Sequence, residues 1–325
     1  MPLVPSSYNP NFLLSKSAHF QTIYPSIFRK LKKNFTRERL NTPDDDILDI
    51  EWLKSSKVNN KLIIGLHGLE SSALAPYVAN TLCYFNENGW DAISMHNRGC
   101  SGELNHKPHA YHSGYTGDLA FLIDHVASLY PNYETIVLVG YSMGGNLMLK
   151  YIGEKSNKLL PNIKTAVAIS VPFDLDECGK QISKWYNMLY LWNFLLPMKQ
   201  KLKDKLKIYP DFVNWDDIKH ARNFEQFDNA YTAPIYGFAN AQDYYEQASC
   251  KNYIDRIEIP FLVVNALNDP ILTKSCYPYE KAAQSNNFYL ETPKYGGHLG
   301  FIQKSTEGYY WHDARIFDFV TNTIH

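Results

Sequence analysis

The chain has 325 residues, 45% of them hydrophobic, and a formal net charge of −1 at pH 7. This length is enough to bury a large core in a single domain, and the balanced charge argues against a nucleic-acid-binding protein. The five cysteines lie far apart without a CxxC pair, which favours a reducing compartment, so we expect a cytoplasmic protein.

The N-terminal part, about 1–34, is interpreted as an extension ahead of the fold. Its first residues, MPLVPSSYNPNFLL, contain neither a basic stretch nor a long apolar run, so no signal peptide is expected. The first regular pattern is ILDIEW at 47–52, where apolar and acidic residues alternate. This period of two predicts a half-buried strand, and the turn residues TPDDD before it predict an antiparallel hairpin with 35–40.

Short, nearly continuous apolar runs follow, and such runs are typical of strands buried on both faces of a parallel sheet. They lie at 61–68, 91–96, 135–140, 165–171, 260–266 and 287–292. Helix-compatible segments lie at 74–88, 117–130 and 142–155, and a last helix is expected near 306–322. The alternation predicts one α/β domain with a mostly parallel central sheet and an antiparallel N-terminal hairpin.

The interval between 171 and 260 is far too long for a loop in a compact domain, so we expect a helical cap insertion at about 172–258. Its apolar stretch WYNMLYLWNFLLP is interrupted by Asn187 and Asn193 and closed by Pro197. It is too short and too broken for a membrane span. The basic segment 199–207 is interpreted as a solvated helix face, with contact to a membrane surface as the alternative.

The motif Gly140-Tyr141-Ser142-Met143-Gly144 lies where a buried strand gives way to a helix. The G-x-S-x-G spacing is typical of a nucleophile elbow, a tight turn that exposes a serine hydroxyl above the sheet. The alternative is an ordinary glycine-rich turn. The strand–turn–helix context favours Ser142 as a catalytic nucleophile.

A serine nucleophile needs a base and a group that orients the base. Asp269 is the only acid in the loop LNDPIL after the run 260–266. His298 is the only later histidine in a loop that follows a strand, within PKYGGHLGF. The order Ser142, Asp269, His298 is that of the α/β-hydrolases. The alternatives are a turn residue for Asp269 and a satisfied core histidine for His298.

Two backbone N–H groups are expected to bind the oxyanion. Met143, directly after the nucleophile, would supply one. Leu69, in the turn HGLESS after the run 61–66, would supply the other. We expect His67 to brace this loop rather than to take part in the chemistry.

Three further features favour structural roles. His106, His109 and His112 have a spacing that a metal site could use, but no acid or cysteine nearby completes a ligand set, so a wall beside the active site is favoured and no metal or cofactor is expected. Cys100 is interpreted as a structural thiol. Arg98 is expected to tie its loop through charge-assisted hydrogen bonds.

Taken together, the chain resembles the YheT-like α/β-hydrolases (the AB hydrolase 4 family), relatives of the ABHD1/ABHD3-type esterases. The resemblance covers nearly the whole chain and includes FLLSKSAHFQTIYPSIFR, HGLESS, HNRGCSGELN, YHSGYTGDL, GYSMGGN, VPFDLDECG, DYYEQAS, NALNDPI and GGHLGF. It implies an α/β-hydrolase fold with a helical cap and a triad on Ser142, Asp269 and His298. Two departures lie outside the triad: Asn268, where relatives often carry an acid, and Ser71-Ser72, where they often have Gly-Ser.

The function expected is therefore hydrolysis of short- to medium-chain acyl esters by a serine carboxylic-ester hydrolase through an acyl-enzyme. Acyl transfer to an alcohol, a lipase or phospholipase activity on the same triad, and non-catalytic ligand binding on this fold stay open as alternatives. The expected partner is a small-molecule ester. No nucleic acid and no membrane span are expected, contact with a lipid surface stays open, and no oligomeric state is predicted.

Overall fold

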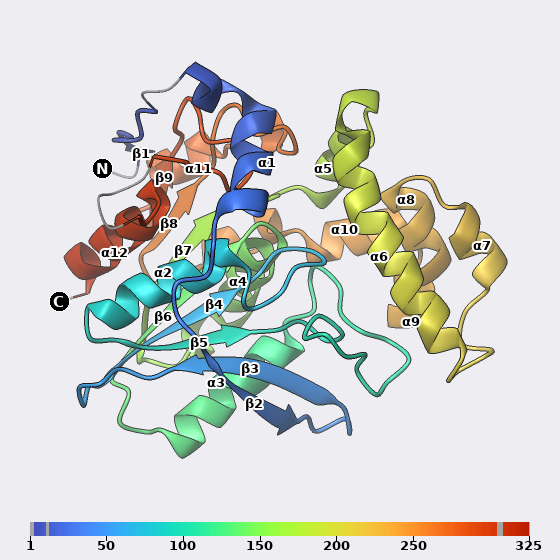
Figure 1. Cartoon of the computed structure of the whole chain (residues 1–325), viewed down its shortest axis with the longest axis horizontal. Helices are drawn as coiled ribbons and strands as arrows, with labels where there is room; N and C mark the ends of the chain where they lie inside the picture. The colour runs from blue at the N-terminus through green and yellow to red at the C-terminus, as the bar shows by residue number, and fades with distance from the viewer. Residues whose placement is uncertain (1–2, 11–12, 304–307, 325) are drawn as a thin grey trace.

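A computed structural model describes residues 3–10, 13–303 and 308–324 and contains one nine-stranded sheet (Figure 1). The strands are β1 (Leu3–Val4), β2 (Thr36–Asn41), β3 (Ile47–Leu53), β4 (Lys61–Leu66), β5 (Asp91–Met95), β6 (Thr135–Tyr141), β7 (Ile163–Ile169), β8 (Phe261–Val264) and β9 (Phe288–Glu291). Their order in the sheet is β1-β9-β8-β7-β6-β4-β5-β3-β2. Only β3 pairs antiparallel, with β2 and with β5. The prediction of a mostly parallel sheet with an N-terminal hairpin is confirmed.

Helices cover both faces of this sheet. Successive side chains of a strand point to opposite faces, and in β6 Ile136 packs into one buried cluster while Val137 packs into the other. The cluster with Val137 contains residues of α2 (Pro76–Glu87) and α12 (Trp311–Thr323). The other contains residues of α3 (Gly117–Leu129), α4 (Met143–Lys155) and α11 (Tyr279–Gln284). Because both faces are covered, the central strands have continuous apolar runs.

Some elements differ from their predictions. The strand β1 was not predicted, because two residues carry no pattern. The predicted last helix is α12, which begins at Trp311, and residues 306 and 307 of that prediction lie outside the described residues. The prediction that β3 is half-buried is wrong. Asp49 and Glu51 are only 3% and 2% exposed, because Arg39 and Arg37 of β2 pair with them across the hairpin.

The N-terminal part contains a short 3-10 helix, η1 (Leu13–Lys16), and the α-helix α1 (Ala18–Phe28), for which Ser17 is the N-cap. No pattern in the sequence predicted this helix. It lies at one end of the sheet, beside the loop that follows β9 (Figure 1). This position brings it next to the residues of the site described below.

The chain between β7 and β8 contains only helices as regular elements among the residues that the structure describes. It contains α5 (Leu175–Ile182), η3 (Trp185–Asn187), α6 (Met188–Leu206), α7 (Trp215–His220), α8 (Phe224–Phe227), η4 (Asp228–Thr232), α9 (Ala233–Tyr236), α10 (Ala241–Ala248), η5 (Cys250–Asn252) and η6 (Ile254–Arg256). A separate hydrophobic cluster that includes Leu191, Ile218 and Phe227 holds α6, α7 and α8 together. In Figure 1 these helices gather beside one end of the sheet.

The longest of these helices, α6, continues through Pro197 into the basic segment 199–207. Within the part of the chain that the structure describes, no helix combines the length and the apolar character that crossing a membrane requires. Two of its lysines do not face solvent, as described below.

Candidate active site

Ser142 lies at the sharp turn between β6 and α4. Its backbone has φ 53° and ψ −121°, a region that residues with a side chain rarely adopt. The turn is tight enough to require its glycines: a Cβ on Gly140 would lie 2.6 Å from the Gly144 carbonyl oxygen, and one on Gly144 would lie 2.5 Å from that of His67. The motif GYSMG thus forms the strand–turn–helix arrangement that its spacing predicted, and the serine side chain stands at its apex.

Asp269 and His298 meet Ser142 from the loops after β8 and β9. His298 Nε2 lies 2.9 Å from Ser142 Oγ, and His298 Nδ1 lies 2.8 Å from Asp269 Oδ2. A carboxylate can only accept, so Nδ1 carries the proton and Nε2 is left to accept the serine hydroxyl. The other carboxylate oxygen of Asp269 accepts the backbone N–H groups of Ile271 and Leu272. These bonds fix the orientation of the carboxylate and, through it, of the imidazole.

The helix α1 holds the loop that carries His298. The backbone N–H of His298 donates to Thr22 Oγ1 over 2.9 Å, and the Thr22 hydroxyl in turn donates to the Ala18 carbonyl. The loop passes so close to α1 that a Cβ on Gly297 would lie 2.6 Å from the same Ala18 oxygen. Sequence reasoning missed Thr22, because nothing in the local pattern of the N-terminal extension reveals a contact with a loop near the other end of the chain.

The turn after β4 approaches the serine closely. A Cβ on Gly68 would lie 3.2 Å from Ser142 Cβ, and the Gly68 N–H donates to the Tyr77 hydroxyl over 2.9 Å. Leu69 and Met143 both line a cavity that also contains Ser142. Within the described residues, the backbone N–H groups of Leu69 and Met143 donate to no protein acceptor. Both donors are therefore available beside the serine.

His67 braces this turn, as expected. It is fully buried, and burial lowers the pKa of its imidazole to about 3. Its Nε2 accepts the backbone N–H of Asn97 over 3.0 Å, while Nδ1 lies 2.7 Å from the Gly68 carbonyl and donates to it. A neutral ring with one donor and one acceptor satisfies both bonds. The expected role of Arg98 is also confirmed: its guanidinium pairs with Asp44, Asp46 and Asp118.

Two cavities meet at Ser142 and His298. The inner cavity, of about 140 Å³, lies against helices of the stretch between β7 and β8 and is lined mainly by apolar side chains, among them Met143, Leu175, Ile182, Phe194, Met198 and Phe227. The outer cavity, of about 380 Å³, lies between α1 and the start of α6, and its lining includes Thr22, Ile23, Leu189 and Tyr190. Ser142 and His298 thus line both a small apolar cavity and a larger one.

Charged side chains of α6 form part of the wall of the inner cavity. Lys201 Nζ lies 2.8 Å from Glu70 Oε2, and the Tyr111 hydroxyl donates to Glu70 Oε1 over 2.8 Å. Lys205 is only 2% exposed and donates to Asn105; burial lowers the pKa of its amine to about 8. The expectation that 199–207 is a solvated face is therefore wrong for these two lysines, because α6 turns them toward the loops at the end of the sheet.

The remaining candidates have structural environments. His112 lines the inner cavity and packs edge-to-face on Tyr236, as expected for a wall residue. Among the described residues, no group of three or more histidine, cysteine or acidic side chains is arranged to hold a metal ion. Cys100 is buried, and burial raises the pKa of its thiol to about 11. A thiol in that state is a poor nucleophile, which agrees with a structural role.

Comparison with known proteins agrees with this arrangement. Residues 61–305 match the family model described as alpha/beta hydrolase fold. The chain is 33% identical over 315 residues to "Putative esterase YheT" of Escherichia coli (strain K12), covering 95% of this chain and 91% of that protein. It is 27% identical over 311 residues to "Phospholipase ABHD3" of Mus musculus, covering 93% of this chain and 75% of that one.

Two further similarities concern a smaller share of the relative or the fold alone. "Monoacylglycerol lipase" of Saccharomyces cerevisiae is 29% identical over 288 residues, which cover 86% of this chain and 62% of that protein. Among solved structures, the Pyrococcus furiosus esterase Pf2001 superposes with a TM-score of 0.59 at 17% identity, covering 91% of this chain and 98% of that one. At that identity the likeness concerns the fold alone.

Proposed function

The chain belongs to the alpha/beta hydrolase family, and from this membership we propose that it is a carboxylesterase-type serine hydrolase. The observation that carries the proposal is the unbroken chain of contacts from Asp269 through His298 to Ser142, at 2.8 and 2.9 Å. Relatives named as an esterase, a phospholipase and a lipase support ester hydrolysis as the reaction.

In this mechanism Ser142 Oγ attacks the carbonyl carbon of the ester while His298 Nε2 takes the hydroxyl proton. The negative charge that develops on the carbonyl oxygen is stabilised by the N–H groups of Leu69 and Met143. The ester C–O bond then breaks, and the histidine returns its proton to the leaving alcohol. Asp269 stabilises the imidazolium throughout. Water, deprotonated by His298, next attacks the acyl-enzyme and releases the acid and the free serine.

The inner cavity suggests the size of the acyl group. Its volume of about 140 Å³ is close to that of an engineered apolar cavity of about 150 Å³ that binds benzene. A chain of roughly four to eight carbons would fill such a space. We therefore propose short- to medium-chain acyl esters as substrates, with the acyl chain in the inner cavity, under a cap formed by about 172–258, and the alcohol in the outer one.

Lipid esters are a second candidate substrate class. The larger outer cavity, of about 380 Å³, would accept a glycerol-based alcohol, and two relatives are named for activity on lipids. In this variant the triad and the chemistry are unchanged, and only the leaving alcohol differs.

The test is hydrolysis of 4-nitrophenyl esters from acetyl to palmitoyl by the wild type and by Ser142→Ala. We expect maximal kcat/KM near butyryl to octanoyl and a loss of at least about 1,000-fold in the alanine variant. Ester product formed when ethanol is added would indicate acyl transfer instead of hydrolysis. Full activity of Ser142→Ala would contradict the proposal, and a rate that rises steadily to palmitoyl would contradict the assignment of the inner cavity.

A further inference from the structure

Exposed apolar side chains concentrate in two short segments of the surface. Of the sixteen large hydrophobic side chains exposed in the described part of the chain, ten lie in 13–28 or 185–196. They are Leu13, Leu14, Ile23, Ile27, Phe28, Trp185, Tyr186, Leu189, Trp192 and Leu196. We call these ten residues the apolar rim. Trp185 is 84% exposed and Leu13 is 78% exposed, so their side chains contribute almost nothing to the core.

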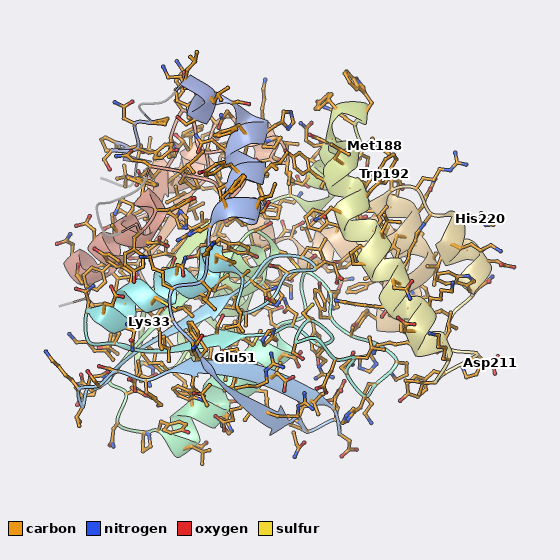
Figure 2. All side chains as sticks on the ribbon, viewed as in Figure 1. Lys33, Glu51, Met188, Trp192, Asp211 and His220 are labelled. Carbon is orange, nitrogen blue, oxygen red and sulfur yellow. The ribbon has the colours of Figure 1, made fainter. Side chains whose placement is uncertain are left out.

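The two segments lie side by side. The His19 ring on α1 is hydrogen-bonded to the Tyr190 hydroxyl on α6 at 2.9 Å. Figure 1 shows α1 next to the first half of α6, the half on which Met188 and Trp192 are labelled in Figure 2. The two halves of the apolar rim are therefore neighbours in space, although they are far apart in the sequence.

The apolar rim borders the outer cavity that leads to Ser142. Ile23 from α1 and Leu189 from α6 are both exposed, and both line the outer cavity that also contains Ser142 and His298. A molecule that contacts the apolar rim is thus at the entrance of the proposed site for the alcohol.

The two segments that carry the apolar rim have charged side chains of one sign only. Residues 13–33 and 182–203 contain no aspartate or glutamate, whereas Lys16, Lys30 and Lys184 are exposed within them. Exposed tryptophan and aliphatic side chains bordered by lysines fit the interface of a membrane with anionic headgroups. Self-association through this face would bring like charges together, which opposes it.

From these observations we propose that the apolar rim docks the protein on an anionic phospholipid surface, with the outer cavity opening toward the lipid. The side chains would insert among the headgroups and acyl boundary while the lysines pair with lipid phosphates and carboxylates. This inference rests on the proposed function in one respect only, namely that the outer cavity facing the lipid is the entrance to a catalytic site. Binding to lipid itself does not require Ser142.

The experiment is flotation of the whole protein with vesicles of phosphatidylcholine and phosphatidylserine at 3:1, and with vesicles of phosphatidylcholine alone. We expect binding to the anionic vesicles, at least tenfold weaker binding to the neutral ones, and weakening by salt. The double variant Ile27→Ser/Trp185→Ser should lose at least tenfold in binding but keep its rate on soluble 4-nitrophenyl butyrate. The matched control, Val58→Ser/Leu129→Ser, removes two exposed side chains outside the apolar rim and should bind like the wild type.

Ser142→Ala should also bind like the wild type, which separates this inference from the proposed catalysis. Absence of binding to both vesicles, equal binding to both, or an equal loss in the control variant would overturn it. A dimer in gel filtration that Ile27→Ser/Trp185→Ser dissociates would overturn it as well, because the apolar rim would then cover a second copy of the chain.

Discussion

The backbone N–H of His298 donates to Thr22 Oγ1 over 2.9 Å, so a helix near the N-terminus positions the loop that carries the proposed general base. The same loop is held from the other side by the contact of His298 with Asp269. The position of the imidazole therefore depends on α1 as well as on the sheet.

Thr22→Val should disturb this position, because it keeps the shape of the side chain but leaves the His298 N–H without its acceptor. We expect kcat on 4-nitrophenyl butyrate to fall about tenfold, which corresponds to about 1.4 kcal/mol and is typical of one lost hydrogen bond to a buried group. Thr22→Ser retains the hydroxyl and should restore most of the rate. Equal rates in the valine and serine variants would show that the bond does not position the loop.

The Lys201–Glu70 pair connects the helix α6 to the residue next to Leu69. Lys201→Met leaves the Glu70 carboxylate without its cation, and we expect the turn of the proposed oxyanion donor to loosen. The expected loss in kcat is about tenfold, with a smaller change in KM. Lys203→Met, on the exposed side of the same helix, is the control and should have no effect. If Glu70→Gln and Lys201→Met have additive effects, the pair is not coupled.

Gly144→Ala tests the tight turn at Ser142. The added Cβ would lie 2.5 Å from the His67 carbonyl oxygen, so β4 and α4 must move apart. We expect a loss of several kcal/mol in the free energy of unfolding, measured by urea denaturation. Gly179→Ala on α5 has no atom within 4 Å of the new Cβ and should be neutral or stabilising by up to about 1 kcal/mol. Similar midpoints for the two variants would contradict the steric account.

Stability should fall in acid because of His67. Its pKa is lowered from 6.5 to about 3 by burial, so below pH 6.5 the unfolded state binds a proton that the folded state does not. The free energy of unfolding should then decrease by about 1.4 kcal/mol per pH unit for this group as pH falls from 6.5 toward 3. In His67→Asn this proton is no longer taken up on unfolding. The slope of the free energy of unfolding against pH, measured by urea denaturation at several pH values, should therefore be smaller by about 1.4 kcal/mol per pH unit. An unchanged slope would contradict the account.

Much of the architecture could be predicted from the sequence, because it depends on local patterns. The apolar runs of β4 to β9 indicate burial of those strands, and the glycines around Ser142 indicate a tight turn. Asp269 and His298 could be selected because each lies in a loop that follows a predicted strand. The burial of Asp49 and Glu51 was missed, since the alternating pattern of β3 gives no sign that arginines from β2 cover the acidic face. Thr22 and Lys201 were missed for a related reason: each acts through a partner distant in sequence.

The central claim, that His298 activates Ser142 as a nucleophile, is tested most directly by reaction with a fluorophosphonate followed by mass spectrometry of the peptides. The account predicts one adduct, on the peptide with Ser142, that is absent in Ser142→Ala and forms at least about 100-fold more slowly in His298→Gln. A wild-type protein that stays unlabelled, or that is labelled on another residue, would contradict it.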